Sequence, residues 1–165
     1  MIKITHEIEQ TIYSAKNLFE IYKDTFLSDL NLIKMLSLLE SKINLSREEM
    51  IKSGIVNECA SCSLQKRETC CTYRTGFKCD TTLLLINLLM NVKLPEFSFY
   101  PELCHFLTEK GCCLKARPVI CINYTCSQLR ENIPFDKLLR VQEITGQEMD
   151  LLFKTENYIK QLLRK

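Results

Sequence analysis

The sequence has few of the residues on which the common catalytic and phosphate-binding motifs depend. Its 165 residues include only four glycines and two histidines. The glycines are too widely separated for a Gly-x-Gly-x-x-Gly turn or a Walker loop, so neither standard phosphate cradle is present. With two histidines, neither a Ser–His–Asp triad nor a Cys–His pair has support, and the acidic residues form no recognisable motif. These absences favour a protein that is not an enzyme.

Long apolar runs, a strong net charge and a leader-like start are also missing. No run approaches the roughly 18 apolar residues of a membrane-spanning helix. The net charge of +2 is too small to indicate a nucleic-acid or membrane-surface partner. Residues 1–7 contain no apolar segment of the kind that a secretory signal needs. We therefore expect a cytoplasmic protein with no nucleic-acid partner and no membrane association.

Helical periodicity dominates the first quarter of the chain. Apolar residues recur at steps of three and four, as on one face of an amphipathic helix: Ile8, Ile12, Ala15, Phe19, Tyr22 and Phe26. The pattern predicts helix over about residues 6–43, as one helix or as two with a break at 23–25 or 28–29. Seven of the ten residues in 30–39 are apolar, so we expect that stretch to be buried on most sides.

Capping signals predict the ends of several helices. The capping-box pattern of residues 46–49 predicts a short helix that stops near Gly54, and residues 145–148 repeat the pattern within a helical segment that starts at Pro134. Asp80 or the threonine after it can cap a helix that runs to Met90.

A proline, a glycine and the charges between them predict one more helix in the centre. Pro101 is suited to a first helical position, Lys110 to a last turn, and Gly111 to the position just beyond it. We therefore expect a short helix over residues 101–110 that carries Cys104. The predicted fold is mainly α and forms a single domain.

The domain, residues 1–165, divides into helical flanks and a different centre. The flanks, 5–58 and 134–164, enclose an irregular cysteine-rich stretch over 59–126. All ten cysteines lie in that stretch. Such a density indicates disulfides in a secreted mini-protein, whereas in a cytosolic chain it favours metal ligation or redox chemistry.

The spacing of the cysteines leaves the kind of centre open. Cys59 and Cys62 form a Cys-x-x-Cys pair, which lets two thiolates turn toward one metal. Ordinary zinc sites add a second such pair or two histidines, and this chain has neither a second pair nor a paired-histidine motif. Adjacent cysteines point in different directions, so each of the two doublets offers one ligand to a given metal. An iron–sulfur cluster, zinc, and disulfides or no metal all remain possible interpretations.

One spacing occurs twice within the cysteine-rich stretch. Intervals of 8, 1 and 8 residues separate four cysteines in each of two blocks: Cys62, Cys70, Cys71 and Cys79, then Cys104, Cys112, Cys113 and Cys121. The repetition is either the mark of two half-sites or a coincidence among ten clustered cysteines.

The order of the cysteine motifs resembles that of a known family. Along about 70 central residues the chain has Cys59-x-x-Cys62, Cys70-Cys71, Cys104-x-x-Leu107, Gly111-Cys112, Arg117-Pro118-x-x-Cys121 and Tyr124-x-Cys126. This set resembles the YkgJ-like cysteine-cluster family of zinc- or iron-chelating domains. In the family the doublet follows the first pair within a few residues, whereas here seven residues, 63–69, intervene.

The resemblance implies a set of metal ligands and a supporting cation. The implied ligands are Cys59, Cys62, Cys70, Cys71, Cys104, Cys112, Cys121 and Cys126. Arg117, in the matched Arg-Pro motif, would bind to the centre through hydrogen bonds to metal-bound thiolates. Cys79 and Cys113 have no counterpart in the family pattern and are left as spares.

The function predicted from these features is metal binding, with iron–sulfur or zinc as the cofactor and a redox, sensing or metal-handling role. One alternative is an interaction module in which zinc is purely structural and a protein partner binds elsewhere. Another is an enzyme similar to the flagellin lysine methylases, which carry a similar cysteine cluster in much longer chains. The lack of a glycine-rich motif for a nucleotide or methyl donor argues against the enzyme.

Overall fold

The computed structural model describes residues 2–65 and 69–164. The chain is mainly α-helical, as the sequence predicts, with a small two-stranded hairpin in its centre. The helices are α1 (Ile2–Ser28), α2 (Leu30–Ser53), α3 (Ile55–Gln65), α4 (Tyr73–Gly76), α5 (Thr81–Leu89), α6 (Val119–Asn123), α7 (Ser127–Asn132) and α8 (Phe135–Leu162). The strands β1 (Leu107–Thr108) and β2 (Gly111–Cys112) are antiparallel.

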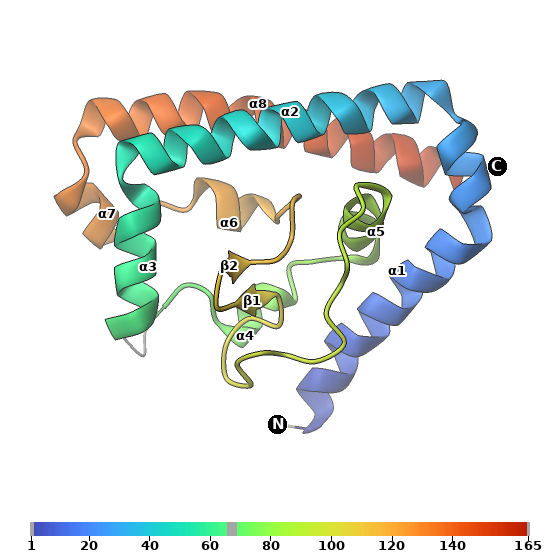
Figure 1. The fold of residues 1–165 in the computed structure, drawn as a ribbon, viewed down its shortest axis with the longest axis horizontal. Helices are drawn as coiled ribbons and strands as arrows, with labels where there is room; N and C mark the ends of the chain where they lie inside the picture. Colours follow the sequence, from blue (N-terminus) through green and yellow to red (C-terminus); the bar gives the residue numbers. More distant parts are fainter. Residues whose placement is uncertain (1, 66–68, 165) are drawn as a thin grey trace.

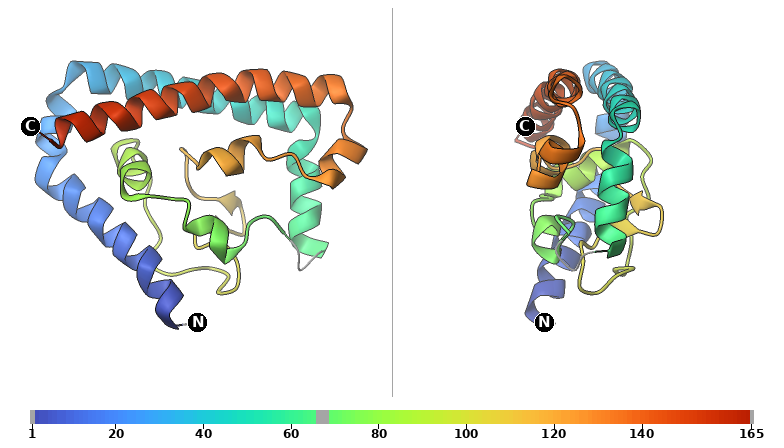
Figure 2. Two further views of the ribbon diagram at one scale, coloured as in Figure 1. Left: turned by 180° about the vertical axis from the view of Figure 1, so that it is seen from behind. Right: turned by 90° about the vertical axis from the view of Figure 1, so that its left-hand side faces the viewer.

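Two long helices, α2 and α8, lie side by side and antiparallel along one edge of the molecule (Figures 1 and 2). At one end the Tyr158 hydroxyl donates to the Asp29 carboxylate at 3.1 Å, and further along Lys42 Nζ donates to Gln147 Oε1 at 2.7 Å. Helix α1 leaves this pair at one end and α3 at the other, so both descend around the central segments (Figure 1). The helix pair and its two arms form the frame in which the cysteine-rich segments lie.

The break between the first two helices falls at Asp29, one of the two places that the sequence suggests. The side chain of Asp29 caps α2 by accepting from the backbone N–H of Leu32 at 2.8 Å, as N-cap residues do. The predicted burial of residues 30–39 on most sides is wrong. Leu32, Leu36 and Leu39 are buried, but Leu30 is 81% exposed, because α2 packs through one face only.

The two capping-box predictions are wrong as helix starts. Ser46 lies inside α2, which continues to its left-handed C-cap at Gly54 (φ 90°), so only the predicted stop is right. Thr145 and Glu148 lie inside α8, which is one continuous helix from Phe135. Ser46, Thr145 and Glu148 are all fully buried, because they face the interior of the molecule from the paired helices.

Of the two helices predicted in the centre, one forms and one does not. Asp80 caps α5 as predicted, accepting from the N–H of Leu83 at 2.8 Å. Residues 101–110 form turns and β1 instead of a helix. Gly111 pairs with Thr108 at the hairpin and has a φ of 94° that favours glycine. A Lys-Gly pair can end a helix or turn a hairpin, and here it does the second.

The buried apolar side chains form two clusters. The larger one joins α1, α2, α5 and α8, and its centre is α5, where Leu84, Leu85 and Ile86 have no exposed surface. Burial of each such side chain stabilises the fold by about 1.5–3 kcal/mol. The smaller cluster surrounds Ile122 of α6 and Leu129 of α7. None of the helices in the described part of the chain combines the length and apolar character needed to cross a membrane.

Candidate metal centre

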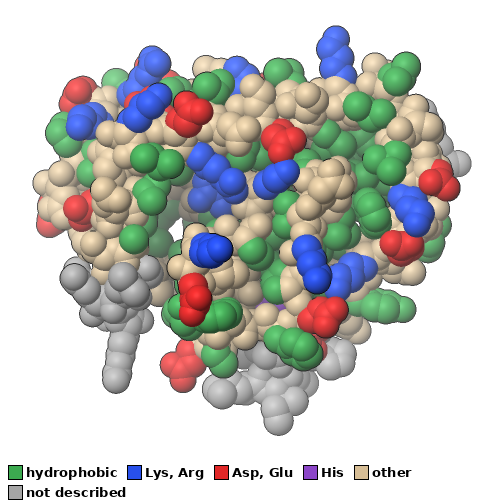
Figure 3. All heavy atoms as spheres, viewed as in Figure 1, with side chains coloured by type: hydrophobic (Ala, Val, Ile, Leu, Met, Phe, Trp, Pro, Cys, Tyr) green, Lys and Arg blue, Asp and Glu red, His purple; other side chains and the backbone are tan. Residues whose placement is uncertain are grey.

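The eight predicted ligands come from several separate segments in the centre of the chain, and the molecule has a hollow beside one of these segments. Figure 3 shows this hollow beside α3, on the side of the helix that faces the hairpin. The cysteines come from separate segments: Cys59 and Cys62 from α3, Cys70 and Cys71 from the residues before α4, Cys104 before β1, Cys112 from β2, Cys121 from α6 and Cys126 from the N-cap of α7. The cysteine-rich stretch is therefore less irregular than predicted, since its first two cysteines lie on a helix. All ten cysteines are free thiols.

Hydrogen bonds between α3 and α7 bring the first and last of these cysteines together. Glu58 Oε2 accepts from Asn132 Nδ2 at 2.7 Å and from Gln128 Nε2 at 3.3 Å. Cys59 follows Glu58 directly, and Cys126 caps the helix that donates both bonds. The pKa of Cys59 is raised to about 11, first by burial of the thiol and then by the neighbouring thiols of Cys70, Cys126 and Cys62. Thiols 67 positions apart in the sequence are thus close in space.

A second set of contacts brings Cys71, Cys104 and Cys112 together. The backbone N–H of Cys104 donates to the carbonyl of Cys71 at 2.9 Å, and Thr72 and Leu103 beside them form an antiparallel bridge. The hairpin then returns the chain, so that Cys112 pairs with Leu107, three residues after Cys104. The strand pairing fixes this group more firmly than helix packing alone would.

Cys121 lies near the same group. Its backbone N–H donates to the carbonyl of Pro118 at 2.8 Å, which forms the first turn of α6. The pKa of Cys121 is raised to about 12 by burial, and next by the thiols of Cys112 and Cys104. The cause is physical proximity: thiolates that repel one another ionise less readily.

The doublet shares one hydrogen bond between its two sulfurs. The Cys71 S–H donates to Cys70, which lowers the pKa of Cys70 to about 6, and the same bond and burial raise the pKa of Cys71. Thr75 Oγ1 donates to the carbonyl of Cys70 at 2.6 Å, and Thr69 Oγ1 accepts from the N–H of Cys71 at 3.2 Å. The doublet is held by side chains on both sides, and Cys70 is the more acidic of its two thiols.

Two arginines place positive charge beside the thiols. Burial raises the pKa of Cys59, Cys112 and Cys121, and the positive charge of Arg117 lowers the pKa of each of these thiols. Arg47, on α2, also lowers the pKa of Cys112, and its Nη2 donates to the carbonyl of Leu114 at 2.8 Å. The two cations are themselves close, because Arg117 lowers the pKa of Arg47 after burial does. The sequence predicts the role of Arg117 but gives no signal for Arg47.

A buried carboxylate accompanies the arginines. Glu148 has no exposed surface, and within the described residues neither carboxylate oxygen has a hydrogen-bond partner of suitable geometry. Burial raises the pKa of Glu148, while the nearby Ser46 hydroxyl and the charges of Arg117 and Arg47 act in the opposite direction. Glu148 and Ser46 both belong to the two capping-box patterns. Because those patterns were interpreted as helix starts, the burial of these two residues was not predicted.

Two cysteines and the central histidine are not among the predicted ligands. Cys79 is packed into the larger apolar cluster with Cys104, and its pKa is raised well above the ordinary value by burial and next by the thiols of Cys104, Cys121 and Cys112. Cys113 follows the last residue of β2, and the thiols of Cys112 and Cys104 raise its pKa after burial does. His105 is buried, with Nε2 at 3.3 Å from the carbonyl of Pro95 and its ring against Phe106.

The thiols are suited by their chemistry to bind zinc or an iron–sulfur cluster. The distances between them, however, are longer than metal ligation requires. Thiolates are the ligands that both groups prefer, and the arginines offset the negative charge that they bring. Within residues 2–65 and 69–164, however, no three His, Cys, Asp or Glu side chains are close enough together to hold one metal ion. The thiols would have to draw together around a metal.

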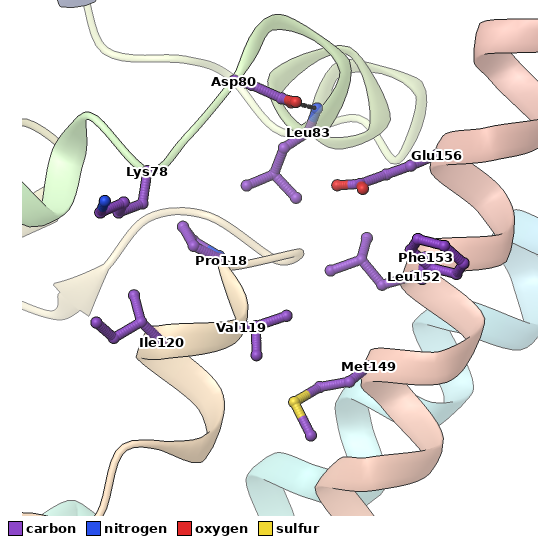
Figure 4. A pocket seen from close by; sticks show the side chains of 10 residues that line it. All are labelled: Lys78, Asp80, Leu83, Pro118, Val119, Ile120, Met149, Leu152, Phe153 and Glu156. Atoms are coloured by element: carbon purple, nitrogen blue, oxygen red, sulfur yellow. Dashed lines mark hydrogen bonds between the residues drawn. The ribbon is translucent and has the colours of Figure 1, made fainter.

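A defined pocket of about 330 Å³ lies elsewhere, between α5, α6 and α8. Its walls are mostly apolar, with Val119 and Ile120 of α6 opposite Met149 and Phe153 of α8 (Figure 4). The Glu156 carboxylate points into the pocket, and no cysteine lines it. Because α6 also carries Cys121, this helix lies between the pocket and the thiols.

Comparison of the chain with protein-family models, with curated proteins and with solved structures finds no match in any of the three. The resemblance to the YkgJ-like family therefore stays a prediction from the cysteine motifs.

Proposed function

We propose that the protein binds a metal through its clustered cysteines, as zinc or as an iron–sulfur cluster. The observation that carries the proposal is the proximity of free thiols from distant segments, such as Cys59 to Cys126 and Cys121 to Cys104 and Cys112. A cytosolic protein has little other use for such a group, since disulfides are rare in a reducing compartment. The cytoplasmic location is part of the same proposal.

The charges around the thiols support this proposal. Four thiolates around one Zn²⁺ carry a net charge of about −2, which has to be offset when the centre is shielded from water. Arg117 and Arg47 supply two positive charges at Cys112, and Arg117 also reaches Cys59 and Cys121. Two cations held together in the interior are unfavourable unless negative charge lies beside them. Burial raises the pKa of Glu148 and so disfavours its charged form, which leaves thiolates as the main source of that negative charge.

The residues named above hold and orient the centre, and the bound group would supply the chemistry. Zinc would cross-link the segments that carry the thiols, whereas an iron–sulfur cluster would add one-electron transfer. We propose a redox, sensing or metal-handling role, and no residue is assigned to catalysis. A structural zinc in an interaction module is the second candidate, favoured by large apolar side chains that are more than half exposed: Phe97, Phe135 and Phe153.

The test is metal analysis of protein purified under reducing, oxygen-free conditions, together with a visible absorption spectrum. Iron with acid-labile sulfide and charge-transfer absorption would establish the iron–sulfur form. Zinc in a fixed ratio with no colour would establish the zinc form. Protein that contains neither metal, and that takes up neither zinc nor a reconstituted cluster after reduction, would refute the proposal.

A further inference from the structure

The pocket between α5, α6 and α8 has the size and lining of a small ligand site. Its volume of about 330 Å³ lies at the small end of the roughly 300–1,000 Å³ that ligand pockets occupy. Such pockets combine mostly apolar walls with a few polar groups that orient the ligand. No cysteine lines this pocket, so a ligand here would not depend on the thiols.

The apolar walls of the pocket are open to solvent. Val119 and Ile120 of α6 are 53% and 49% exposed, and Phe153 of α8 is 63% exposed. An apolar ligand would remove part of this surface from water, which favours binding. Met149, in the same wall, has a thioether that contacts aromatic rings favourably. The walls therefore suit a ligand with an apolar, aromatic body.

Glu156 adds a negative charge to this apolar site. Met149, Phe153 and Glu156 follow one another along one face of α8 at steps of four and three. The Glu156 carboxylate points into the pocket (Figure 4). Burial and then the charge of Asp80 raise its pKa, while Lys160 acts in the opposite direction. Lys160 forms its ion pair with Asp80, so Glu156 has no ion-pair partner among the described residues.

The other charged groups at the pocket do not take the place of a cationic ligand. Asp80 is already engaged, since Oδ1 accepts from the N–H of Leu83 at 2.8 Å and Oδ2 lies 3.8 Å from Lys160 Nζ. The Lys78 ammonium lies at the edge of the pocket and is directed away from the side chains of α8 (Figure 4). The charge that faces the apolar walls is therefore negative, which favours a cation and disfavours an anion.

We propose that this pocket binds a small organic amine in its protonated form. The apolar body of the ligand lies against Val119, Met149 and Phe153, and its ammonium group donates to the Glu156 carboxylate. The volume suits one free amine of this kind and is too small for a folded segment of a partner protein. The site is separate from the proposed metal centre and gives the protein a second class of ligand.

The experiment is an NMR titration of the full chain, labelled at the methionine methyl groups, with phenethylamine as the probe. Met149 lines the pocket, whereas Met35, Met50 and Met90 do not. The signal that Met149→Leu removes should shift with added amine, and the other three should stay in place. Phenethyl alcohol has the same size without the charge, and hydrocinnamate carries a negative charge. The amine should bind about 10-fold more tightly than the alcohol, as a hydrogen bond between charged groups allows, and hydrocinnamate most weakly.

The variant that tests the carboxylate is Glu156→Gln, which keeps the size of the side chain and removes its charge. It should lower the affinity for phenethylamine about 10-fold and leave that for phenethyl alcohol unchanged. Glu143→Gln, at an exposed position of the same helix, is the matched control and should bind as the wild type does. Equal affinity of the wild type for amine and alcohol, an equal effect of the two variants, or an unmoved Met149 signal would each overturn the proposal. None of these outcomes bears on the thiols, so metal binding is tested separately.

Discussion

The charge of Arg117 reaches thiols on three separate elements. It lowers the pKa of Cys59 on α3, of Cys112 on β2 and of Cys121 on α6, so it favours the thiolates that a metal requires. Its Nε has no hydrogen-bond partner in the described part of the chain, which leaves a donor free for a metal-bound sulfur. The side chain is held instead by a contact of Nη2 with Met50 Sδ at 3.8 Å.

Replacing Arg117 by methionine should weaken metal binding by about 10- to 100-fold, the usual effect of losing a group that supports metal ligands. Methionine keeps much of the length of the side chain and removes the charge. The measurement is competition with a chelator of known affinity. Arg140→Met, at an exposed position on α8, is the control and should bind metal as the wild type does. Equal affinity in the two variants would contradict the role of Arg117.

Glu148→Gln should change how stability depends on pH. Because burial raises the pKa of this carboxyl in the fold, its contribution is fully present below the ordinary value of 4.5 and is lost as the pH rises through the raised value. The variant should therefore lose less stability than the wild type between pH 4.5 and 7. Urea midpoints across this range, compared between the two proteins, measure the difference. Parallel curves would show that Glu148 does not titrate as inferred.

The sequence predicts some residues of the candidate site and misses others. The ten cysteines stand out by density, and the resemblance of their order to the YkgJ-like pattern selects eight of them as candidate ligands. Arg47 and Glu148 could not be named in advance, because a charged residue on a helix is ordinarily at the surface and only packing places it inside. Which thiols lie near one another depends on hairpin register and helix contact, which spacing does not encode.

At the scale of elements, Asn87 of α5 holds the segment that follows β2. Its Nδ2 donates to the carbonyls of Leu83 and Ala116, each at 2.9 Å. Its Oδ1 accepts from the N–H groups of Lys115 at 2.8 Å and of Ala116 at 3.2 Å. The side chain has no exposed surface, so each of these bonds is made in the interior. Asn87 thereby fixes the residues between Cys112 and Arg117.

Asn87→Leu should lower the free energy of unfolding by about 2–4 kcal/mol, because it leaves buried backbone groups without partners. Metal affinity should fall with it, since the segment that carries Cys112 and Arg117 loses its attachment. Urea unfolding and chelator competition measure the two effects. Asn44→Leu, the same change at an exposed position of α2, is the control. A variant as stable as this control would contradict the attachment.

Helix boundaries were predicted correctly where a single capping side chain determines them. They were predicted wrongly where the same sequence pattern is compatible with two different structures. Asp29 and Asp80 each accept a backbone N–H, and both predicted boundaries are confirmed. The patterns at 46–49 and 145–148 also fit a capping box, but each lies in a long helix whose apolar face continues through it. Residues 101–110 show the same ambiguity, because glycine with positive φ serves helix ends and hairpins alike.

At the scale of the whole molecule, the thiols lie between the two apolar clusters. Cys104 belongs to the larger cluster, and Cys126 packs against the smaller one. A metal bound between them would join the clusters, and it would stabilise the folded chain by binding that state and not the unfolded one. Removing the metal should therefore loosen the attachment of α3 and α7 more than that of α2 and α8.

The metal-free protein should lose stability as the pH rises above about 9. The pKa of Cys59 and of Cys113 is about 11 and that of Cys121 about 12 in the fold, against an ordinary value of 9.0. The unfolded chain thus releases these protons first, so their contribution is full below pH 9 and is lost as the pH approaches 11–12. Urea midpoints at pH 8, 9 and 10 under reducing conditions measure it.

The control for this prediction is Cys113→Ser, which removes one of these three thiols and should reduce the slope of stability against pH. A metal-free wild type equally stable at pH 8 and 10 would contradict the burial of these thiols.

The pairing of α2 with α8 has a consequence for the newly made chain. These helices contact each other across about a hundred residues, from Asp29 to Tyr158 at one end and from Lys42 to Gln147 further along. At roughly 5–20 residues per second, the ribosome needs about 5–20 s to complete α8 after it has made Cys59. During that time the cysteines have been synthesised, but α2 cannot yet pair with α8 to form the helical frame around them. Closure of the helical frame around the thiols is therefore a late event in biosynthesis, so the thiols stay unprotected while the chain is still growing.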